Sequence, residues 1–219
     1  MSRDYDVIII GTGPAGFACA MQSSKFDKDV LVVESHKKYL GGTWINTGTV
    51  PSKALREAAK NILDFNEQFG DHEHKKPYER FKMNDLLQYK QEILEKENQK
   101  VKNDLIKNKV DVARGFGRLK DKHTVEVETH IGSTETYTAD YVLISTGSSP
   151  IQPQNFEVDN DKVLDYKSIL DITHIPRLLV IIGSGVNAIE YATIFAALGT
   201  RVTLLSGQKD YLTFLDYEI

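Results

Sequence analysis

Cysteine is almost absent from this sequence of 219 residues, in which Cys19 is the only one. A single cysteine excludes an intrachain disulfide and a redox-active pair of thiols within the chain. Its neighbours Phe17, Ala18 and Ala20 are apolar and follow a helical pattern, so we expect Cys19 to be a small buried side chain. The six histidines are scattered without the further ligands that a metal site needs, and we therefore predict no metal.

Long apolar runs are also missing, since nothing approaches the roughly 20 apolar residues that span a bilayer. Charge of one sign is not in excess: 27 Lys and Arg face 31 Asp and Glu, a net charge of −4. This balance gives no reason to expect a nucleic acid or an anionic membrane as a partner. A strand pattern begins at Tyr5 and leaves no room for a signal peptide, so we expect a cytoplasmic protein.

The pattern of apolar residues predicts an α/β fold with two Rossmann-like βαβ units, a helical insertion and a small β-hairpin region. Runs typical of strands occupy residues 5–10, 30–34, 110–113, 124–128, 135–138, 141–145, 178–182 and 201–205. Helical patterns occupy residues 14–24, 51–69, 84–109 and 186–198. Gly132-Ser133 lies between two of the strand runs and predicts a hairpin, and the polar residues 71–80 predict a loop.

The first βαβ unit carries a glycine fingerprint, Gly11-Thr12-Gly13-Pro14-Ala15-Gly16, between its strand and its helix. In such a motif Gly11 allows a tight turn, Gly13 lets a pyrophosphate approach the backbone, and Gly16 lets helix and strand pack closely. The pyrophosphate then meets the unpaired N–H groups at the start of the helix. Glu34 ends the second strand, where a carboxylate can accept hydrogen bonds from ribose hydroxyls. The unit therefore predicts a dinucleotide site.

A second fingerprint, Gly183-Ser184-Gly185-Val186-Asn187-Ala188, has the same place in the second βαβ unit. The interval from Gly11 to Glu34 (34 − 11 = 23 residues) equals that from Gly183 to Ser206 (206 − 183 = 23 residues). The small side chain of Ala188 permits the same contact of helix and strand as a third glycine. This internal repeat predicts two bound dinucleotides.

The segment from Gly41 to Lys53 reads Gly-Gly-Thr-Trp-Ile-Asn-Thr-Gly-Thr-Val-Pro-Ser-Lys. It resembles the flavoproteins with two dinucleotide-binding domains, which include glutathione reductase and dihydrolipoamide dehydrogenase. In that family the stretch runs along the isoalloxazine ring and holds two redox cysteines, whose places are taken here by Trp44 and Thr49. Disulfide exchange requires a thiolate, so we predict that the chain is not a disulfide reductase of that design. Trp44 either stacks on or shields the ring, or is a neutral replacement.

Thr49, followed by Val-Pro-Ser-Lys-Ala-Leu-Arg, resembles the soluble pyridine-nucleotide transhydrogenase branch of this family, as does Thr213-Phe214-Leu215-Asp216. The resemblance implies an FAD-binding domain in residues 1–150, the start of an NAD(P)-binding domain in residues 151–219, and a homodimer. It implies hydride transfer between NADPH and NAD through FAD. Because the second domain stops after one βαβ unit, we expect a truncated amino-terminal part of a longer enzyme. Two alternatives stay open: another NAD(P)H:acceptor flavin oxidoreductase of the same fold, or a non-catalytic FAD-binding fragment.

The resemblance also implies roles for single residues. Lys53 is expected to support negative charge on the reduced flavin, held by Glu190 in a buried ion pair, and Thr49 completes the set of catalytic residues. The residues expected to bind FAD or NAD(P) are Gly11, Gly13, Pro14, Ala15, Gly16, Glu34, Ser35, Gly42, Thr43, Trp44, Thr49, Ser52, Lys53, Gly115, Phe116, Gly117, Thr146, Gly147, Gly183, Gly185, Val186, Ala188, Glu190 and Ser206.

Ser206 stands where NAD-specific sites carry an acid. A carboxylate there binds the 2′-hydroxyl of NAD and repels the 2′-phosphate of NADP, whereas serine does neither strongly. Lys209 is near enough in sequence to assist a phosphate. We therefore expect the second site to tolerate both NAD and NADP, as a transhydrogenase requires.

Overall fold

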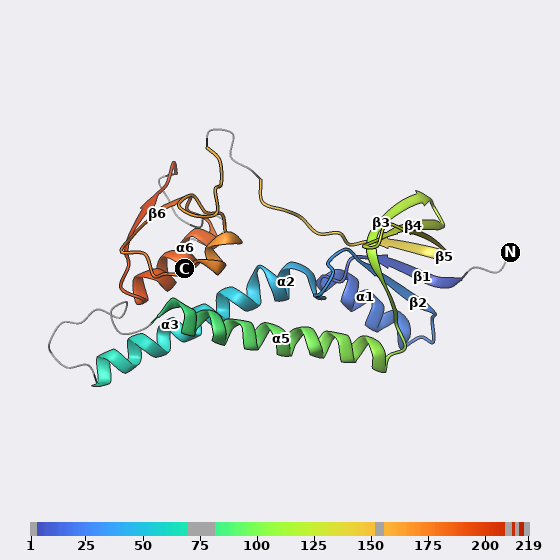
Figure 1. The fold of residues 1–219 in the computed structure, drawn as a ribbon, viewed down its shortest axis with the longest axis horizontal. Coiled ribbons are helices and arrows are strands. Elements are labelled where there is room, and N and C mark those ends of the chain that lie inside the picture. The colour runs from blue at the N-terminus through green and yellow to red at the C-terminus, as the bar shows by residue number, and fades with distance from the viewer. Residues whose placement is uncertain (1–3, 70–81, 152–155, 209–211, 213–214, 217–219) are drawn as a thin grey trace. The chain divides into compact units, whose positions relative to one another are not determined.

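The structure, a computed structural model, describes residues 4–69, 82–151, 156–208, 212 and 215–216. The chain forms two compact units, one from Met1–Val50 and Leu94–Ile151, the other from Pro51–Ile93 and Gln152–Ile219 (Figure 1). Two long helices, α3 (Thr49–Phe69) and α5 (Met83–Lys107), each begin in one unit and end in the other. The assignment of residues 1–150 to FAD and of 151–219 to NAD(P) stays a prediction.

The first unit is built on a sheet that is parallel in one part and antiparallel in the other. Its elements are β1 (Tyr5–Ile10), α1 (Pro14–Ser24), β2 (Val30–Glu34), α2 (Gly42–Asn46), β3 (Asp111–Asp121), β4 (Thr124–Thr129) and β5 (Thr134–Ile144). Strands β3, β2, β1 and β5 pair in parallel, with Ile10 opposite both Val33 and Ile144. Strand β4 pairs antiparallel with β3 and with β5, so the five strands close into a barrel (Figure 1).

The apolar runs of β1 and β2 are continuous because both faces of these strands are buried. On one face Ile9 and Val32 pack with Ala20 of α1 and with Val101 and Leu105 of α5. On the other face Ile8, Ile10, Leu31 and Val33 pack with Val125 and Val127 of β4. The carboxyl ends of β1 and β2 lie beside each other, where the fingerprint loop begins.

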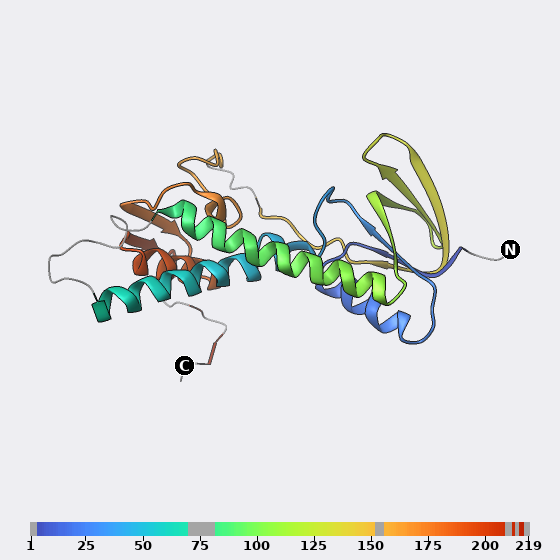
Figure 2. The same cartoon turned by 60° about the horizontal axis from the view of Figure 1, so that its bottom comes forward.

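The second unit contains a smaller parallel pair of strands covered by helices. Its further elements are η1 (Ser168–Asp171), β6 (Leu178–Ile182), α6 (Val186–Ala197) and β7 (Arg201–Leu205). Strands β6 and β7 pair in parallel, with Ile182 opposite Leu205. The core gathers Tyr191, Ile194, Phe195 and Leu198 at α6, Leu55, Ala59 and Ile62 of α3, and Met83 and Leu86 of α5. Figure 2 shows α3 and α5 running side by side.

A buried cation anchors η1 to α5 in this unit. The Lys90 side chain is only 7% exposed, and its Nζ donates to the carbonyl oxygen of Leu170 at 2.6 Å and to Asp171 Oδ1 at 2.7 Å. Burying an ammonium group is costly unless it is paired and hydrogen-bonded, and both conditions are met here.

Most of the predicted elements are confirmed, and the α/β fold class with two Rossmann-like βαβ units is correct. The hairpin across Gly132 is confirmed, with this glycine at φ +86°. The prediction of separate strands at 135–138 and 141–145 is wrong, because β5 pairs with β4 along its first half and with β1 along its second, without a break. Helix α2 was not among the predicted helices. The loop predicted at residues 71–80 lies outside the described residues.

Of the helices in the described part of the chain, none is long and apolar enough to cross a bilayer. Among the same residues, no group of three histidine, cysteine, aspartate or glutamate side chains is placed to hold a metal ion.

Truncation of Phe195, which is 1% exposed, should unfold the second unit more easily. We expect Phe195→Ala to lower its free energy of unfolding by about 3–5 kcal/mol, the usual cost of emptying a buried aromatic site. Urea unfolding followed by far-UV circular dichroism measures this loss. Fluorescence of the single tryptophan, Trp44, reports unfolding of the first unit, and the unfolding transition measured in this way should shift less.

The matched control is Phe26→Ala, which removes the same atoms from a side chain that is 68% exposed. It should change the free energy of unfolding by less than about 0.5 kcal/mol. Equal losses in the two variants would contradict the assignment of Phe195 to the core.

Candidate nucleotide-binding sites

Two of the three glycines of the first fingerprint leave no space for a side chain. Gly11 has φ +106°, and a Cβ on it would lie 2.4 Å from the carbonyl oxygen of Ser145. A Cβ on Gly16 would lie 2.0 Å from the carbonyl oxygen of Gly11. Ser145 closes this turn, because its Oγ donates to the carbonyl oxygens of Ile10 at 3.0 Å and of Gly11 at 3.2 Å. The turn is thus locked in the form that the motif predicts.

Gly13 differs, because it faces open space. Its backbone is extended, with φ −61° and ψ −178°, and a Cβ on it would have no heavy atom of the described residues within 4 Å. It is the N-cap of α1, where no side chain in the described part of the chain caps the helix and Pro14 follows as the first residue. The helix start has no capping side chain, and glycine at the N-cap leaves space in front of it. A pyrophosphate can occupy this space and accept hydrogen bonds from the unpaired N–H groups of the first turn. These residues therefore fit a dinucleotide.

Glu34 is buried at the end of β2, with 7% of its surface exposed. Its Oε2 accepts from the backbone N of Thr12 at 3.3 Å and from the Thr12 hydroxyl, and its Oε1 accepts from the backbone N of His36 at 2.8 Å and from Ser35 Oγ at 3.5 Å. The Thr12 hydroxyl in turn accepts from the backbone N of Gly41 at 3.0 Å. A ribose hydroxyl bound at Glu34 would join or replace one of these donors.

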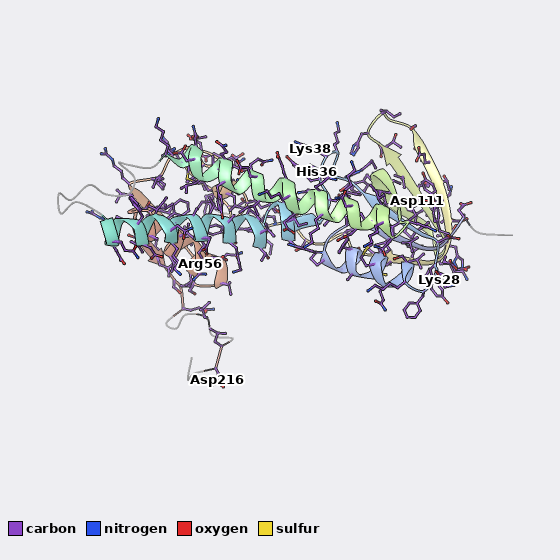
Figure 3. All side chains as sticks on the ribbon, turned by 90° about the horizontal axis from the view of Figure 1, so that it is seen from below. Lys28, His36, Lys38, Arg56, Asp111 and Asp216 are labelled. Carbon is purple, nitrogen blue, oxygen red and sulfur yellow. The ribbon has the colours of Figure 1, made fainter. Side chains whose placement is uncertain are left out.

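The turn after Glu34 is ordered by Arg114 of β3. Arg114 lies opposite Glu34 in the β2–β3 register, and its Nη1 donates to the carbonyl oxygens of His36 and Tyr39, both at 2.9 Å. Burial lowers the pKa of Arg114, while the carboxylate of Glu34 acts in the opposite direction. His36 stacks on Tyr39 with ring centres 5.0 Å apart, and Lys38 lies 5.1 Å from the centre of the same ring. Figure 3 shows His36 and Lys38 together in this turn.

The segment that resembles the flavin-contacting stretch lies against the fingerprint. Gly42 has φ +58°, and a Cβ on it would lie 2.8 Å from Gly13 Cα. Thr43 and Thr49 are both exposed, and Thr49 is the first residue of α3. Trp44 is partly buried and meets Phe17 of α1 edge-on, with ring centres 6.3 Å apart. Trp44 therefore contributes to packing, whatever further role it has.

Lys53 and Glu190 lie together in the second unit, with Nζ and Oε1 4.0 Å apart. The expected burial of this pair is wrong: the Lys53 side chain is 65% exposed and that of Glu190 22% exposed. The reason is that Lys53 lies on the outer face of α3 while its neighbours Ala54 and Leu55 face the core. Glu190 has a closer partner in the buried Ser52, whose Oγ donates to the same carboxylate oxygen at 3.1 Å.

Two further segments, 115–117 and 146–147, were predicted to contact FAD. They belong to β3 and to the chain directly after β5, and these strands pair with β2 and β1. Gly115 and Gly117 lie in β3, where a Cβ on Gly115 would meet the carbonyl oxygen of Glu128 at 2.4 Å and one on Gly117 would meet Val33 Cγ1 at 3.0 Å. Packing thus excludes a side chain at Gly115 and leaves little room for one at Gly117, while Phe116 between them is 55% exposed. Thr146 and Gly147 directly follow Ser145, are exposed, and have Gly147 at φ +70°.

The second fingerprint repeats the backbone of the first. Gly183 has φ +128° and its N donates to the carbonyl oxygen of Leu205 at 2.8 Å, as Gly11 N donates to that of Val33 at 2.8 Å. Gly185, the N-cap of α6, is extended like Gly13, with φ −79° and ψ −179°, and has no heavy atom of the described residues within 4 Å of a Cβ position. The same uncapped start, here with Val186 as the first helical residue, fits a second pyrophosphate.

The two units differ in the turn after their second strand. Ser206 closes its own turn: its Oγ donates to the carbonyl oxygen of Gln208 at 2.9 Å and accepts from the Gln208 N at 3.0 Å. Lys209 lies outside the described residues. Ala188 of α6 is less close to its glycine than Gly16 is, since its Cβ would lie 3.9 Å from a Cβ placed on Gly183. Burial raises the pKa of Tyr191, and the adjacent carboxylate of Glu190 raises it further.

Sequence reasoning missed Thr12, Ser145 and Arg114, which hold the predicted residues in place. Thr12 occupies the variable second position of the fingerprint, and Ser145 directly precedes the predicted Thr146-Gly147 turn, so both could have been proposed from their positions. Arg114 carries no signal of this kind, because its partners are 78 and 75 residues away in the sequence.

Comparisons with known proteins agree with this geometry. The model of the pyridine nucleotide-disulphide oxidoreductase family matches residues 5–219. A soluble pyridine nucleotide transhydrogenase of Mycobacterium bovis is 41% identical over 99% of this chain and 46% of its own length. A protein of the same name from Pseudomonas paraeruginosa is 38% identical over the same shares of the two chains. This chain therefore spans about half the length of the curated relatives that it matches.

Solved structures give the same fold. The HOCl-induced flavoprotein disulfide reductase RclA from Escherichia coli has a TM-score of 0.80 at 26% identity, covering 98% of this chain and 45% of that chain. LpdA from Mycobacterium tuberculosis has a TM-score of 0.84 at 24% identity, covering 94% of this chain and 46% of that one. The resemblance drawn from residues 41–53 is thus confirmed over the whole chain: it belongs to the pyridine nucleotide-disulphide oxidoreductase family.

Proposed function

We propose that this chain belongs to a flavoprotein oxidoreductase in which the first fingerprint binds FAD, the second binds NAD(P)H, and hydride passes between NADPH and NAD without a redox disulfide. The observation that carries this proposal is the repeat of one backbone geometry at Gly11–Gly16 and at Gly183–Ala188, each with an open N-cap glycine. Two such loops support two dinucleotides. The names of the relatives support the transhydrogenase reaction.

The absence of thiols at the flavin segment supports transfer between nucleotides rather than to a disulfide. Trp44 and Thr49 stand at the two places, and Cys19, the only cysteine, packs within α1 with its Sγ 3.8 Å from Ser23 Oγ. FAD, when bound, accepts two electrons from a reduced nicotinamide and passes them to a second acceptor. In this proposal the start of α1 binds the pyrophosphate, and Glu34 at the end of β2 binds a ribose hydroxyl. Lys53 supplies a positive charge that stabilises the reduced flavin.

The homodimer that the resemblance implies and the cytoplasmic location expected from the amino-terminal sequence both stay predictions.

The purified and desalted chain should carry a flavin absorption band, or acquire one when FAD is added. Addition of NADPH, and separately of NADH, should bleach this band, because the second fingerprint presents a nicotinamide dinucleotide. Transfer from NADPH to a thio-NAD analogue then tests the transhydrogenase reaction in a full-length protein. A chain that binds no flavin would contradict the proposal for the first fingerprint. Bleaching without transfer to the analogue would favour a different acceptor.

Gly13→Ala should weaken FAD binding strongly without harming the fold. The new methyl group enters open space and an extended backbone, so the free energy of unfolding should stay within about 0.5 kcal/mol of the original. It fills the place where the pyrophosphate meets the helix start, and FAD affinity should fall about 10- to 100-fold, since a hydrogen bond to a charged group contributes roughly 1.5–3 kcal/mol. Fluorescence titration with FAD measures the loss.

The matched control is Gly185→Ala, which adds the same group to the same backbone conformation at the second fingerprint. It should leave FAD affinity unchanged and weaken NAD(P)H binding instead. If both variants affected FAD equally, or neither did, the assignment of the first loop to FAD would be wrong.

Lys53→Met should slow bleaching of the bound flavin by NADPH in a single turnover. A positive charge stabilises the negative charge that builds up on the flavin as it is reduced, but a side chain that is 65% exposed is partly screened by water. We therefore expect about a tenfold slower rate rather than a complete loss. Lys60→Met, which removes an exposed lysine two turns further along α3, is the control and should keep the original rate. An unchanged rate in Lys53→Met would reject this role.

A further inference from the structure

Two asparagines from separate helices form a closed pair in the first unit. Asn98 of α5 donates through Nδ2 to Asn46 Oδ1 at 2.9 Å and to the carbonyl oxygen of Leu94 at 2.9 Å. Its Oδ1 accepts from the backbone N of Leu40 at 2.9 Å. Asn46 of α2 donates through Nδ2 to the carbonyl oxygens of Leu40 at 2.7 Å and of Gly42 at 2.9 Å. Both N–H donors and the oxygen of each carboxamide are therefore engaged.

The hydrogen bonds of this pair hold both ends of the short segment from Leu40 to Asn46. Leu40 is held through its N by Asn98 and through its carbonyl oxygen by Asn46, so the chain cannot rotate at that residue without breaking a hydrogen bond. Leu40 and Ile45 are 4% and 0% exposed and pack with Val101 and Leu105 of α5. The segment is thus attached to α5 by apolar contacts and by the polar pair together.

The segment Leu40–Asn46 also contacts the first fingerprint. Gly41 N donates to the Thr12 hydroxyl at 3.0 Å, and the same hydroxyl donates to Glu34. Gly42 approaches so closely that a Cβ on it would lie 2.8 Å from Gly13 Cα. A continuous set of contacts therefore leads from Asn98 to the open N-cap glycine and to the buried carboxylate.

We propose that Asn98 is a positioning residue for FAD, which fixes Leu40–Asn46 against Thr12 and Gly13 and thereby sets the affinity of the first fingerprint. The inference rests on the proposed function, because it takes FAD as the ligand of that fingerprint. The requirement is for a carboxamide, since the position needs one acceptor for Leu40 and two donors for Asn46 and Leu94. An aspartate keeps the acceptor and turns the donors into a second acceptor, which repels the oxygens of Asn46 and Leu94.

Two variants separate the two functions of the Asn98 side chain, which are to accept from the Leu40 amide and to donate to Asn46. In Asn98→Ala the amide of Leu40 loses its acceptor, and exchange of the Leu40 and Gly41 amide hydrogens in the FAD-free chain should become about tenfold faster or more. In Asn98→Asp the Leu40 amide keeps an acceptor and should stay slow, while the link to Asn46 is lost. Both variants should bind FAD about tenfold more weakly, as expected for the loss of one well-formed hydrogen bond.

The control is Asn103→Asp, on the same helix and in the same unit. Asn103 is exposed, and its Oδ1 accepts from Gln99 Nε2 at 2.7 Å within α5. This variant should keep both the exchange rates and the FAD affinity of the original chain. Exchange at the buried residue Ile9 of β1 monitors the whole unit and should be unchanged in all three variants, which separates local release from general unfolding.

The outcomes are distinguishable. Unchanged exchange at Leu40 and Gly41 in Asn98→Ala would overturn the positioning role, as would faster exchange accompanied by unchanged FAD affinity. If Asn98→Ala does not fold, loss of FAD affinity in Asn98→Asp supports the role and unchanged affinity overturns it. If the original chain binds no FAD, the proposed function fails. Hydrogen exchange then decides alone whether Asn98 positions Leu40–Asn46. Faster exchange in Asn98→Ala supports this role, and unchanged exchange overturns it.

Discussion

The close contact between the ends of β1 and β5 is the constraint on which the first candidate nucleotide site depends. Ser145 N donates to the carbonyl oxygen of Ile10 at 2.9 Å, and its hydroxyl donates to Ile10 and Gly11. This contact leaves no volume for a side chain on Gly11 or Gly16, so the turn must use glycine at both positions. This turn leads directly into α1, whose N-cap Gly13 has no heavy atom of the described residues within 4 Å of a Cβ position.

A buried carboxylate connects this turn to the rest of the first unit. Glu34 lies at the end of β2 with 7% exposure, and burial of an ionised group costs several kcal/mol unless hydrogen bonds compensate for the lost water. Thr12, His36 and Ser35 supply these bonds, and the charge of Arg114 lies on the neighbouring strand. Because Thr12 belongs to the fingerprint and also accepts from Gly41, hydrogen bonds connect the fingerprint loop, the end of β2 and the segment that begins at Gly41.

Sequence patterns predicted those features that depend on short intervals. The helix predicted at 14–24 is Pro14–Ser24 in the structure, because Pro14 at its first position and the fingerprint before it mark the start. The repeat of the two βαβ units follows from spacing alone. The features that could not be predicted depend on contacts between distant segments: Asn46 and Asn98 are 52 residues apart, and β5 is continuous only because it pairs with both β4 and β1. The burial expected of Lys53 was wrong because family resemblance does not specify exposure.

The two units repeat the backbone geometry of the fingerprint but differ in the charge of the residue at the end of their second strand. Where Glu34 brings a carboxylate held by Thr12 and His36, Ser206 brings a neutral hydroxyl already used in its own turn with Gln208. A carboxylate at this place suits a ribose with free hydroxyls and repels a 2′-phosphate. Ser206 exerts neither effect strongly. A transfer between NADPH and NAD would require one site that accepts both ribose forms, and of the two residues Glu34 and Ser206 it is Ser206 that carries no carboxylate.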